Sequence, residues 1–295
     1  MFDYVGRHRI WFSASAAVIL VGLVFLAIPG VGLRLGIDFT GGTLAELRFD
    51  GQPSTGQIRE VLDAKGLGGS IVQKVGTDGH GALIRTRALS AEQRAEMFES
   101  MEKSLGAYKV MRLEEVNGVI GKELTRKALL ALAVANVAMI AYVSLRFEFK
   151  FAIVAVVALI HDVLITLGCL AVIGLEVNGP FVAAILTVVG YSINDTIVVY
   201  DRIRENLKSA GKKQLSEIVN RSIAETLTRS INTSVTTLLA VVAVLVFGGQ
   251  TIREFAVTLL IGITAGTYSS IFIASPLWVL WKNKERGAKA RPRAA

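Results

Sequence analysis

The chain has 295 residues, of which 52% are hydrophobic and only 19% are charged. A soluble protein usually carries about a quarter charged residues, and here the apolar residues gather in long runs around one more polar stretch. This distribution excludes a single large globular core. It favours a membrane protein with one soluble insert.

The net charge of +8 lies mainly at the ends of the apolar runs. That placement is typical of membrane topology and argues against a nucleic-acid partner. The single cysteine, Cys169, lies inside an apolar run, so an intramolecular disulfide and a cysteine metal cluster are both excluded.

Six apolar runs are candidates to cross a bilayer as helices, which takes about 20 residues each. A cleavable signal peptide is the competing interpretation of the first run. That run is longer than a typical signal core and lacks a clear small-x-small cleavage site, so we expect a retained anchor. The predicted spans are Ile10–Ile28, Ala128–Leu145, Phe151–Ile173, Phe181–Tyr200, Ile231–Phe247 and Phe255–Trp281.

Basic residues in the short loops predict the orientation of these spans. They precede the first span, join the second to the third, fill the loop between the fourth and fifth (Lys212 and Lys213 among them) and follow the sixth. Because Lys and Arg gather on the cytoplasmic side, we expect a multi-pass protein of the cytoplasmic (inner) membrane with both termini in the cytoplasm. The expected parts are 1–28 with the first span, a periplasmic domain at 29–127, spans two to six at 128–282, and a basic tail at 283–295.

The polar insert has a regular alternation of patterns. Strands are predicted at Gly42–Phe49, Ser70–Val75, Ala82–Arg87 and Lys109–Val116, and helices at Ser54–Lys65 and Ser90–Leu105. This β-α-β-β-α-β order is that of a ferredoxin-like α/β domain. The insert lacks the His, Cys and carboxylate grouping of a catalytic or metal site, so we expect a binding or moving part, with no cofactor and no covalent chemistry.

Ionisable residues inside spans are rare, because a charge near the bilayer centre costs on the order of 3 kcal/mol. Each candidate comes with polar neighbours on its own helix face. The three predicted stripes are Thr187, Tyr191 and Asp195 in span four; Asp162 and Thr166, beside His161, in span three; and Arg229, Thr233 and Thr237 in span five. We expect these stripes to face one another.

An Asp that gains or loses an Arg neighbour changes its affinity for hydrogen ions with conformation, which is the minimum requirement for proton-coupled motion. Structural interpretations stay open for each residue. Asp195 could be a packing hydrogen-bonder, Arg229 a snorkelling cytoplasmic residue, and His161 a satisfied interior histidine. For Asp162 the two interpretations are balanced.

Three segments together resemble the SecD/SecF family of protein-export membrane proteins. They are Gly36-Ile37-Asp38-Phe39-Thr40-Gly41-Gly42-Thr43 after span one, Val189 to Asn206 in span four, and Arg229-Ser230-Ile231-Asn232-Thr233-Ser234 at the start of span five. The likeness covers nearly the whole chain in order. It favours the SecF branch, since a SecD chain has a much larger external insert. The signature positions are Gly36, Asp38, Phe39, Gly41 and Gly42.

The resemblance implies an α-helical membrane protein whose six spans form half of an RND-type bundle. It implies pairing with SecD, association with the SecYEG channel and YajC, and use of the proton gradient to draw exported unfolded polypeptides outward at a late stage. Asp195 would then titrate, with Arg229 as its basic partner and Asn194 beside it.

Two other functions are compatible with the pattern of spans. A half-size RND-like exporter of lipids or small hydrophobic molecules would share the buried carboxylate, although exporters more often carry a duplicated unit on one chain. A structural membrane scaffold would leave Asp195 and Arg229 without a use.

Overall fold

The computed structural model describes residues 2–28, 32, 34–76, 78–209, 214–249 and 252–290. The expected boundary at 28–29, the basic residues Lys212 and Lys213, and the end of the tail at 291–295 lie outside the described residues. The chain divides into two compact units. One is Leu35–Leu129, and the other, the helical unit, holds the rest of the chain.

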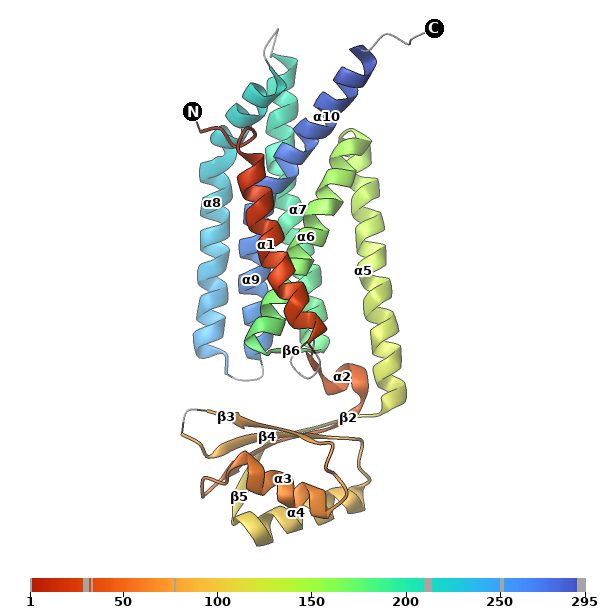
Figure 1. Ribbon diagram of the computed structural model, residues 1–295, viewed down its shortest axis with the longest axis vertical. Coiled ribbons are helices and arrows are strands. Elements are labelled where there is room, and N and C mark those ends of the chain that lie inside the picture. The colour runs from red at the N-terminus through yellow and green to blue at the C-terminus, as the bar shows by residue number, and fades with distance from the viewer. Residues whose placement is uncertain are drawn as a thin grey trace. The chain divides into compact units, whose positions relative to one another are not determined.

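Among the described residues, six helical stretches are long and apolar enough to cross a membrane, which confirms the predicted spans (Figure 1). They are α1 (His8–Ala27), α5 (Gly118–Arg146), α6 (Phe149–Ile173), α7 (Gly179–Lys208), α8 (Leu215–Phe247), and a continuous last stretch of α9 (Arg253–Ser269), the π-helical turn η2 (Ser270–Ala274) and α10 (Ser275–Ala290). The chain is therefore a multi-pass membrane protein. Two short strands, β1 (Arg34–Leu35) and β6 (Glu176–Val177), lie among the connections.

Several helices continue past the apolar runs that predicted them, because their charged ends pair along the helix. Glu123 and Lys127 form an ion pair of 2.7 Å in the first turns of α5, and Arg221 pairs with Glu225 at 2.8 Å in α8. The connection from β5 (Tyr108–Val116) into α5 is short. Asn117 accepts a hydrogen bond from the backbone N–H of Val119 at 3.0 Å, and α5 already begins at Gly118.

The helical unit has its most buried helices at its centre. Half or more of the apolar stretch of α6, of α7 and of the last span is buried, whereas only 11% of that of α1 and 6% of that of α5 is buried. Small residues let α9 lie against α7. A Cβ added to Gly262 would come within 2.4 Å of Val188, and one added to Gly266 would come within 2.9 Å of Ser192. This close approach fits the small-xxx-small spacing of α9.

The second unit follows the predicted element order. Its elements are β2 (Gly42–Phe49), α3 (Thr55–Ala64), β3 (Ile71–Val75), β4 (Gly81–Thr86), α4 (Ala91–Leu105) and β5 (Tyr108–Val116), after a short helix α2 (Ile37–Thr40). The strands form one antiparallel sheet in the order β3-β4-β2-β5. A single core joins sheet and helices, built from Ala45, Leu47, Phe49, Ile58, Leu62, Leu67, Val72, Ala82, Ile84, Met97 and Met101.

Both helices of this unit begin with a capping box. Ser54 accepts from the backbone N–H of Gln57, and Ser90 accepts from that of Gln93, each at 3.2 Å, while both glutamine side chains accept from the cap backbone. These bonds pair helix-start N–H groups that would otherwise lack partners. Ser54 and Ser90 are also the residues at which the two helices were predicted to begin.

Candidate functional site

The signature segment around Gly41 lies where α2 passes into β2 and meets the start of α5. Gly41 and Gly42 have φ values of 72° and 135°, which side chains with a Cβ rarely adopt. A Cβ on Gly41 would also lie 2.6 Å from Cα of Gly118, and a Cβ on Gly42 would lie 2.4 Å from the carbonyl oxygen of Thr86. The glycine pair is therefore explained by backbone geometry. Among the other signature positions, Gly36 is buried at the N-cap of α2, and Asp38 and Phe39 are half-buried within it.

Asp195 lies on the face of α7 that is packed inside the helical unit, and only 6% of the residue is exposed. Ser230 of α8 and Ser270 of η2 stand beside its carboxylate, and the positive charge of Arg229 acts on it. Within the described part of the chain, its Oδ2 atom has no hydrogen-bond partner. A carboxylate oxygen buried in this way is costly unless it binds a hydrogen ion, a water molecule or a further donor.

The face of α8 that meets this carboxylate differs from the predicted one. Thr226, Ser230 and Ser234 are buried at four-residue spacing, whereas Arg229 and Thr233 are exposed. The predicted stripe is therefore wrong by one helix position. Small hydroxyl residues fit the tight helix crossing, while the charge of the exposed Arg229 also acts on Asp195.

The stripe on α7 is also divided. Tyr191 and Asp195 face the interior, and the Tyr191 hydroxyl donates to Ser234 Oγ at 3.3 Å. Thr187 and Asn194 are exposed. Successive side chains of an α-helix are about 100° apart around its axis, so Asn194 lies on a different face of α7 from the buried Asp195.

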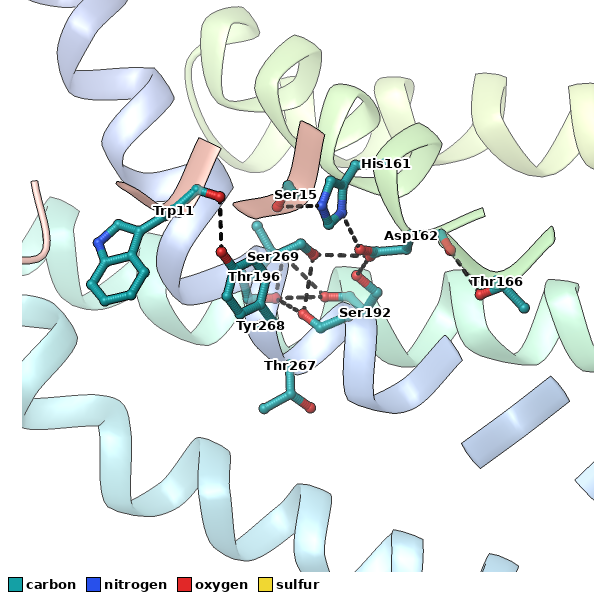
Figure 2. A network of polar contacts seen from close by, with 12 residues as sticks. Trp11, Ser15, His161, Asp162, Thr166, Ser192, Thr196, Thr267, Tyr268 and Ser269 are labelled. Atoms are coloured by element: carbon teal, nitrogen blue, oxygen red, sulfur yellow. Dashed lines mark hydrogen bonds and ion pairs between the residues drawn. The ribbon is translucent and has the colours of Figure 1, made fainter. Parts of the chain in front are cut away.

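A second buried polar group centres on Asp162 of α6, which is 1% exposed (Figure 2). Ser192 of α7 and Ser269 of α9 donate to its Oδ2 atom at 2.7 and 2.9 Å. The ring Nδ1 of His161 lies 2.9 Å from Oδ1. Thr166, predicted to share its stripe, instead donates to the Asp162 backbone carbonyl at 2.7 Å. Both carboxylate oxygens of Asp162 are therefore paired, unlike the Oδ2 atom of Asp195.

His161 has partners at both ring nitrogens. Its Nε2 atom lies 2.9 Å from Ser15 Oγ of α1, and its ring stacks on Tyr268 of α9 at 6.2 Å between centroids. The histidine thus joins α1 to the Asp162 group. The structure supports the satisfied interior histidine in its hydrogen bonding, and it adds a carboxylate partner that the sequence pattern did not reveal.

Serines are the residues that sequence reasoning missed. None of Ser192, Ser269 and Ser270 was singled out as a site residue, yet they supply hydroxyl groups around the two aspartates. Ser269 and Ser270 are adjacent hydroxyl residues inside an apolar span, and this pair is the sequence signal that could have revealed two of the three.

The described residues contain no group of three or more His, Cys, Asp or Glu side chains placed to hold a metal ion. The two aspartate groups can bind and release hydrogen ions, with hydroxyl groups as exchangeable partners.

The chain matches two family descriptions, "Protein export membrane protein SecD/SecF, C-terminal" over residues 96–284 and "SecD/SecF GG Motif" over residues 26–53. It is 44% identical to the protein translocase subunit SecF of Desulfurispirillum indicum, over 95% of this chain and 93% of the relative. It is 42% identical to that of Acidaminococcus fermentans, over 96% of this chain and 98% of the relative.

Solved structures give the same result. The crystal structure of SecDF, a translocon-associated membrane protein from Thermus thermophilus, is similar with a TM-score of 0.86 and 39% identity over 96% of this chain. SecDF in a super-membrane-facing form gives a TM-score of 0.70 and 38% identity over 98% of this chain. This chain spans 39% and 40% of those two SecDF chains, so it corresponds to one part of each. The chain belongs to the SecF branch of the SecD/SecF family of protein export membrane proteins.

Proposed function

We propose that this chain is the SecF-type accessory subunit of the Sec protein translocase, which uses the proton gradient with SecD to drive late-stage movement of polypeptides across the cytoplasmic membrane. The observation that carries the proposal is the unpaired Oδ2 atom of Asp195, buried between α7, α8 and η2. One elementary charge that crosses a potential of about 100 mV releases roughly 2.3 kcal/mol, enough to bias two helix arrangements of similar energy.

In this proposal Asp195 binds and releases the hydrogen ion, and Arg229 stabilises the ionised form when it approaches. Protonated Asp195 is compatible with a closed, apolar packing of α7 on α8. Ionised Asp195 needs a counter-charge or water. Asp162, on α6, is a second buried carboxylate that could take part in proton coupling in the same bundle. No covalent step is required, so the subunit acts as a translocation partner rather than as an enzyme.

SecD is the partner that we infer first, since this chain corresponds to two fifths of a SecDF chain. Polar side chains on the exposed faces of the spans, Asn194 and Arg229 among them, would then meet SecD rather than lipid. We propose that the SecYEG channel, YajC and the emerging unfolded polypeptide are further partners. Exporter activity is not favoured, because the curated relatives named above are translocase subunits.

The four-stranded unit is proposed to be a ferredoxin-like domain. Its element order and its strand order, β3-β4-β2-β5, match that of this fold. We propose that it lies in the periplasm between the first two spans, as the domain at 29–127, with both termini in the cytoplasm and spans two to six at 128–282. In this position it would move with or touch the exported chain.

The test compares Asp195→Asn with Asp201→Asn in membrane vesicles that contain the chain with its SecD partner. Asp201 lies on the same helix but is half-exposed near Arg146 and Arg204, so its loss should be mild. Dissipating the proton gradient should slow late-stage export in wild-type and Asp201→Asn vesicles but hardly affect Asp195→Asn vesicles. Equal sensitivity of all three would contradict the proposal.

A deletion tests the second unit separately. Removal of 43–115 should leave the spans inserted and export stimulation abolished, as measured in the same vesicles. Full stimulation without this segment would remove the unit from the mechanism.

A further inference from the structure

The His161–Asp162 contact is a buried imidazole–carboxylate pair. Proton coupling at Asp195 alone does not explain why the bundle contains it. The two residues come from one turn of α6, yet their partners come from three other helices. Ser15 contacts the ring from α1, while Ser192 of α7 and Ser269 of α9 donate to the carboxylate. The outward-facing polar atoms of the pair, His161 Nε2 and Asp162 Oδ2, thus depend on the packing of α6 against three other helices.

This pair can exist in either of two protonation states, and it keeps its hydrogen bonds in both. With one ion fewer, His161 is neutral, its Nδ1–H donates to Asp162, and Nε2 accepts from the Ser15 hydroxyl. With one ion more, the extra hydrogen lies on Nε2, which now donates to the same hydroxyl. Because a hydroxyl donates as readily as it accepts, Ser15 accommodates both states. The added ion comes from water and returns to it, and no other bond forms or breaks.

The state with one ion more is the neutral one overall, since imidazolium and carboxylate cancel. The state with one ion fewer leaves a single negative charge in the bundle, held by the two serine hydroxyls and the imidazole N–H. The two states therefore differ in how strongly the carboxylate needs Ser269. Such a difference lets helix position and hydrogen content control each other.

Access to the pair is through the histidine ring. His161 and Ser15 line a cavity of about 460 Å³ between α1, α6 and α9, whereas Asp162 does not reach it. The titratable groups that face His161 in the described chain are Asp162 on its own helix, Tyr268 of α9, and Cys169, which lines the same cavity. α1 and α7 contribute only the hydroxyls of Ser15 and Ser192. A hydrogen ion would enter at Nε2.

The two aspartate groups meet at adjacent residues of the last span. Ser269 ends α9 and bonds Asp162, while Ser270 begins η2, contacts Thr196 Oγ1 at 2.8 Å and stands beside Asp195. A shift of Ser270 toward or away from Asp195 must therefore also shift the hydroxyl on Asp162. A π-helical turn is a suitable place for such a shift, because its hydrogen bonding is less regular than that of an α-helix.

We propose that His161 and Asp162 form a second hydrogen-ion binding site in the bundle, and that its occupancy changes together with that of Asp195 through the adjacent serines Ser269 and Ser270. The inference rests on the proposed role of Asp195. It adds a site on α6 and a route of coupling through α9.

The experiment uses the whole chain with its SecD partner in lipid nanodiscs, with nitrogen-labelled histidine in this chain alone. The sequence holds three histidines, so the ring signals of His8, His80 and His161 can be followed by NMR. His161→Gln assigns the buried ring. If that variant does not fold, the double variant His8→Gln with His80→Gln leaves only the His161 signal.

We expect the His161 ring to change its protonation state within roughly pH 5 to 9. Asp162→Asn should move the midpoint by about one pH unit or more, and Asp195→Asn should move it by about 0.3 unit or more. His80, which lies in the other unit, is the internal control, and its ring signals should be the same in these two variants as in the wild-type chain. In a Ser269→Ala background the effect of Asp195→Asn should disappear.

A ring that keeps one protonation state over the whole range would overturn the second site. A midpoint unaffected by Asp195→Asn, or an effect that persists in Ser269→Ala, would overturn the coupling. These measurements are made at equilibrium without export. Failure of the inference is therefore distinguishable from failure of Asp195 in the vesicle assay, and either result can occur without the other.

Discussion

Gly22 of α1 and Gly168 of α6 meet backbone against backbone. A Cβ on Gly22 would lie 2.6 Å from Cα of Gly168, and a Cβ on Gly168 would lie 2.8 Å from Cα of Gly22. Real Cβ atoms do not come this close, so the crossing requires glycine on both helices. Because α1 has few other buried residues, this contact and the Ser15–His161 bond position it on the bundle.

Gly168→Ala should therefore destabilise the helical unit. The added methyl group forces α1 away from α6, and overpacking of this kind costs about 1–3 kcal/mol. Thermal unfolding of the purified chain in detergent measures the effect. Gly190→Ala is the matched control, because Gly190 lies in span-forming α7 with no atom within 4 Å of an added Cβ. If both substitutions leave the melting temperature unchanged, the crossing is not close in the protein.

Arg229 acts on Asp195 by charge, so substitutions there should affect proton coupling more than folding. Arg229→Ala should reduce gradient-dependent export at least about tenfold, the effect of roughly 1.4 kcal/mol, while Arg229→Lys keeps the charge and part of the activity. Arg221→Ala is the control on the same helix, two turns earlier, where the guanidinium pairs with Glu225. Equal losses in Arg229→Ala and Arg221→Ala would point to a general effect on α8.

Tyr108 makes the stability of the four-stranded unit depend on pH in the alkaline range. Burial, with a smaller contribution from the Glu102 charge, raises the pKa of its phenol, and the hydroxyl donates to the Phe98 carbonyl at 3.0 Å. A raised pKa in the folded state means that stability is fully present below the unfolded value of about 10 and is lost as pH rises through the folded value.

Tyr108→Phe should accordingly cost about 1 kcal/mol near neutral pH, the contribution of one hydrogen bond, and lose less stability on going from about pH 8 to pH 11 than the wild-type chain does. Urea unfolding at both pH values measures this difference. An identical alkaline loss in both proteins would exclude Tyr108 as its source.

The capping boxes of α3 and α4 should contribute measurably to the same unit. Ser54→Ala and Ser90→Ala each remove an acceptor for a helix-start N–H group and should cost about 1 kcal/mol. Ser104→Ala, at an exposed position within α4, should stay within about 0.5 kcal/mol of wild type. Urea unfolding at neutral pH compares the three variants, and a cost as large at Ser104 as at Ser90 would contradict the cap assignment.

Local patterns were sufficient for much of the fold. Apolar runs gave the six spans, because only a helix satisfies its own backbone in lipid and about 20 residues are needed to cross. Period-two and period-3.6 patterns with Ser54 and Ser90 as caps gave the elements of the four-stranded unit within one or two residues. The helix extensions beyond the apolar runs were missed, since pairs such as Glu123 and Lys127 have no apolar signal.

The candidate site was predicted less completely. Rarity of charge in lipid was enough to select Asp195, Asp162 and Arg229 from the sequence. The face of α8 that meets α7 could not be predicted in this way. Arg229 and Ser230 are adjacent, and only the packing of whole helices decides which one turns inward.

The sequence by itself determined that the chain spans a membrane, where it crosses, and which ionisable residues it keeps inside, because these properties depend on hydrophobicity along short segments. Only the tertiary structure decided the partners of those residues: the pairing of Asp162 with His161, the open oxygen of Asp195, and the adjacent serines that connect them. Contacts between helices join residues far apart in sequence. They follow from the rotation and distance of each helix, which no single segment specifies.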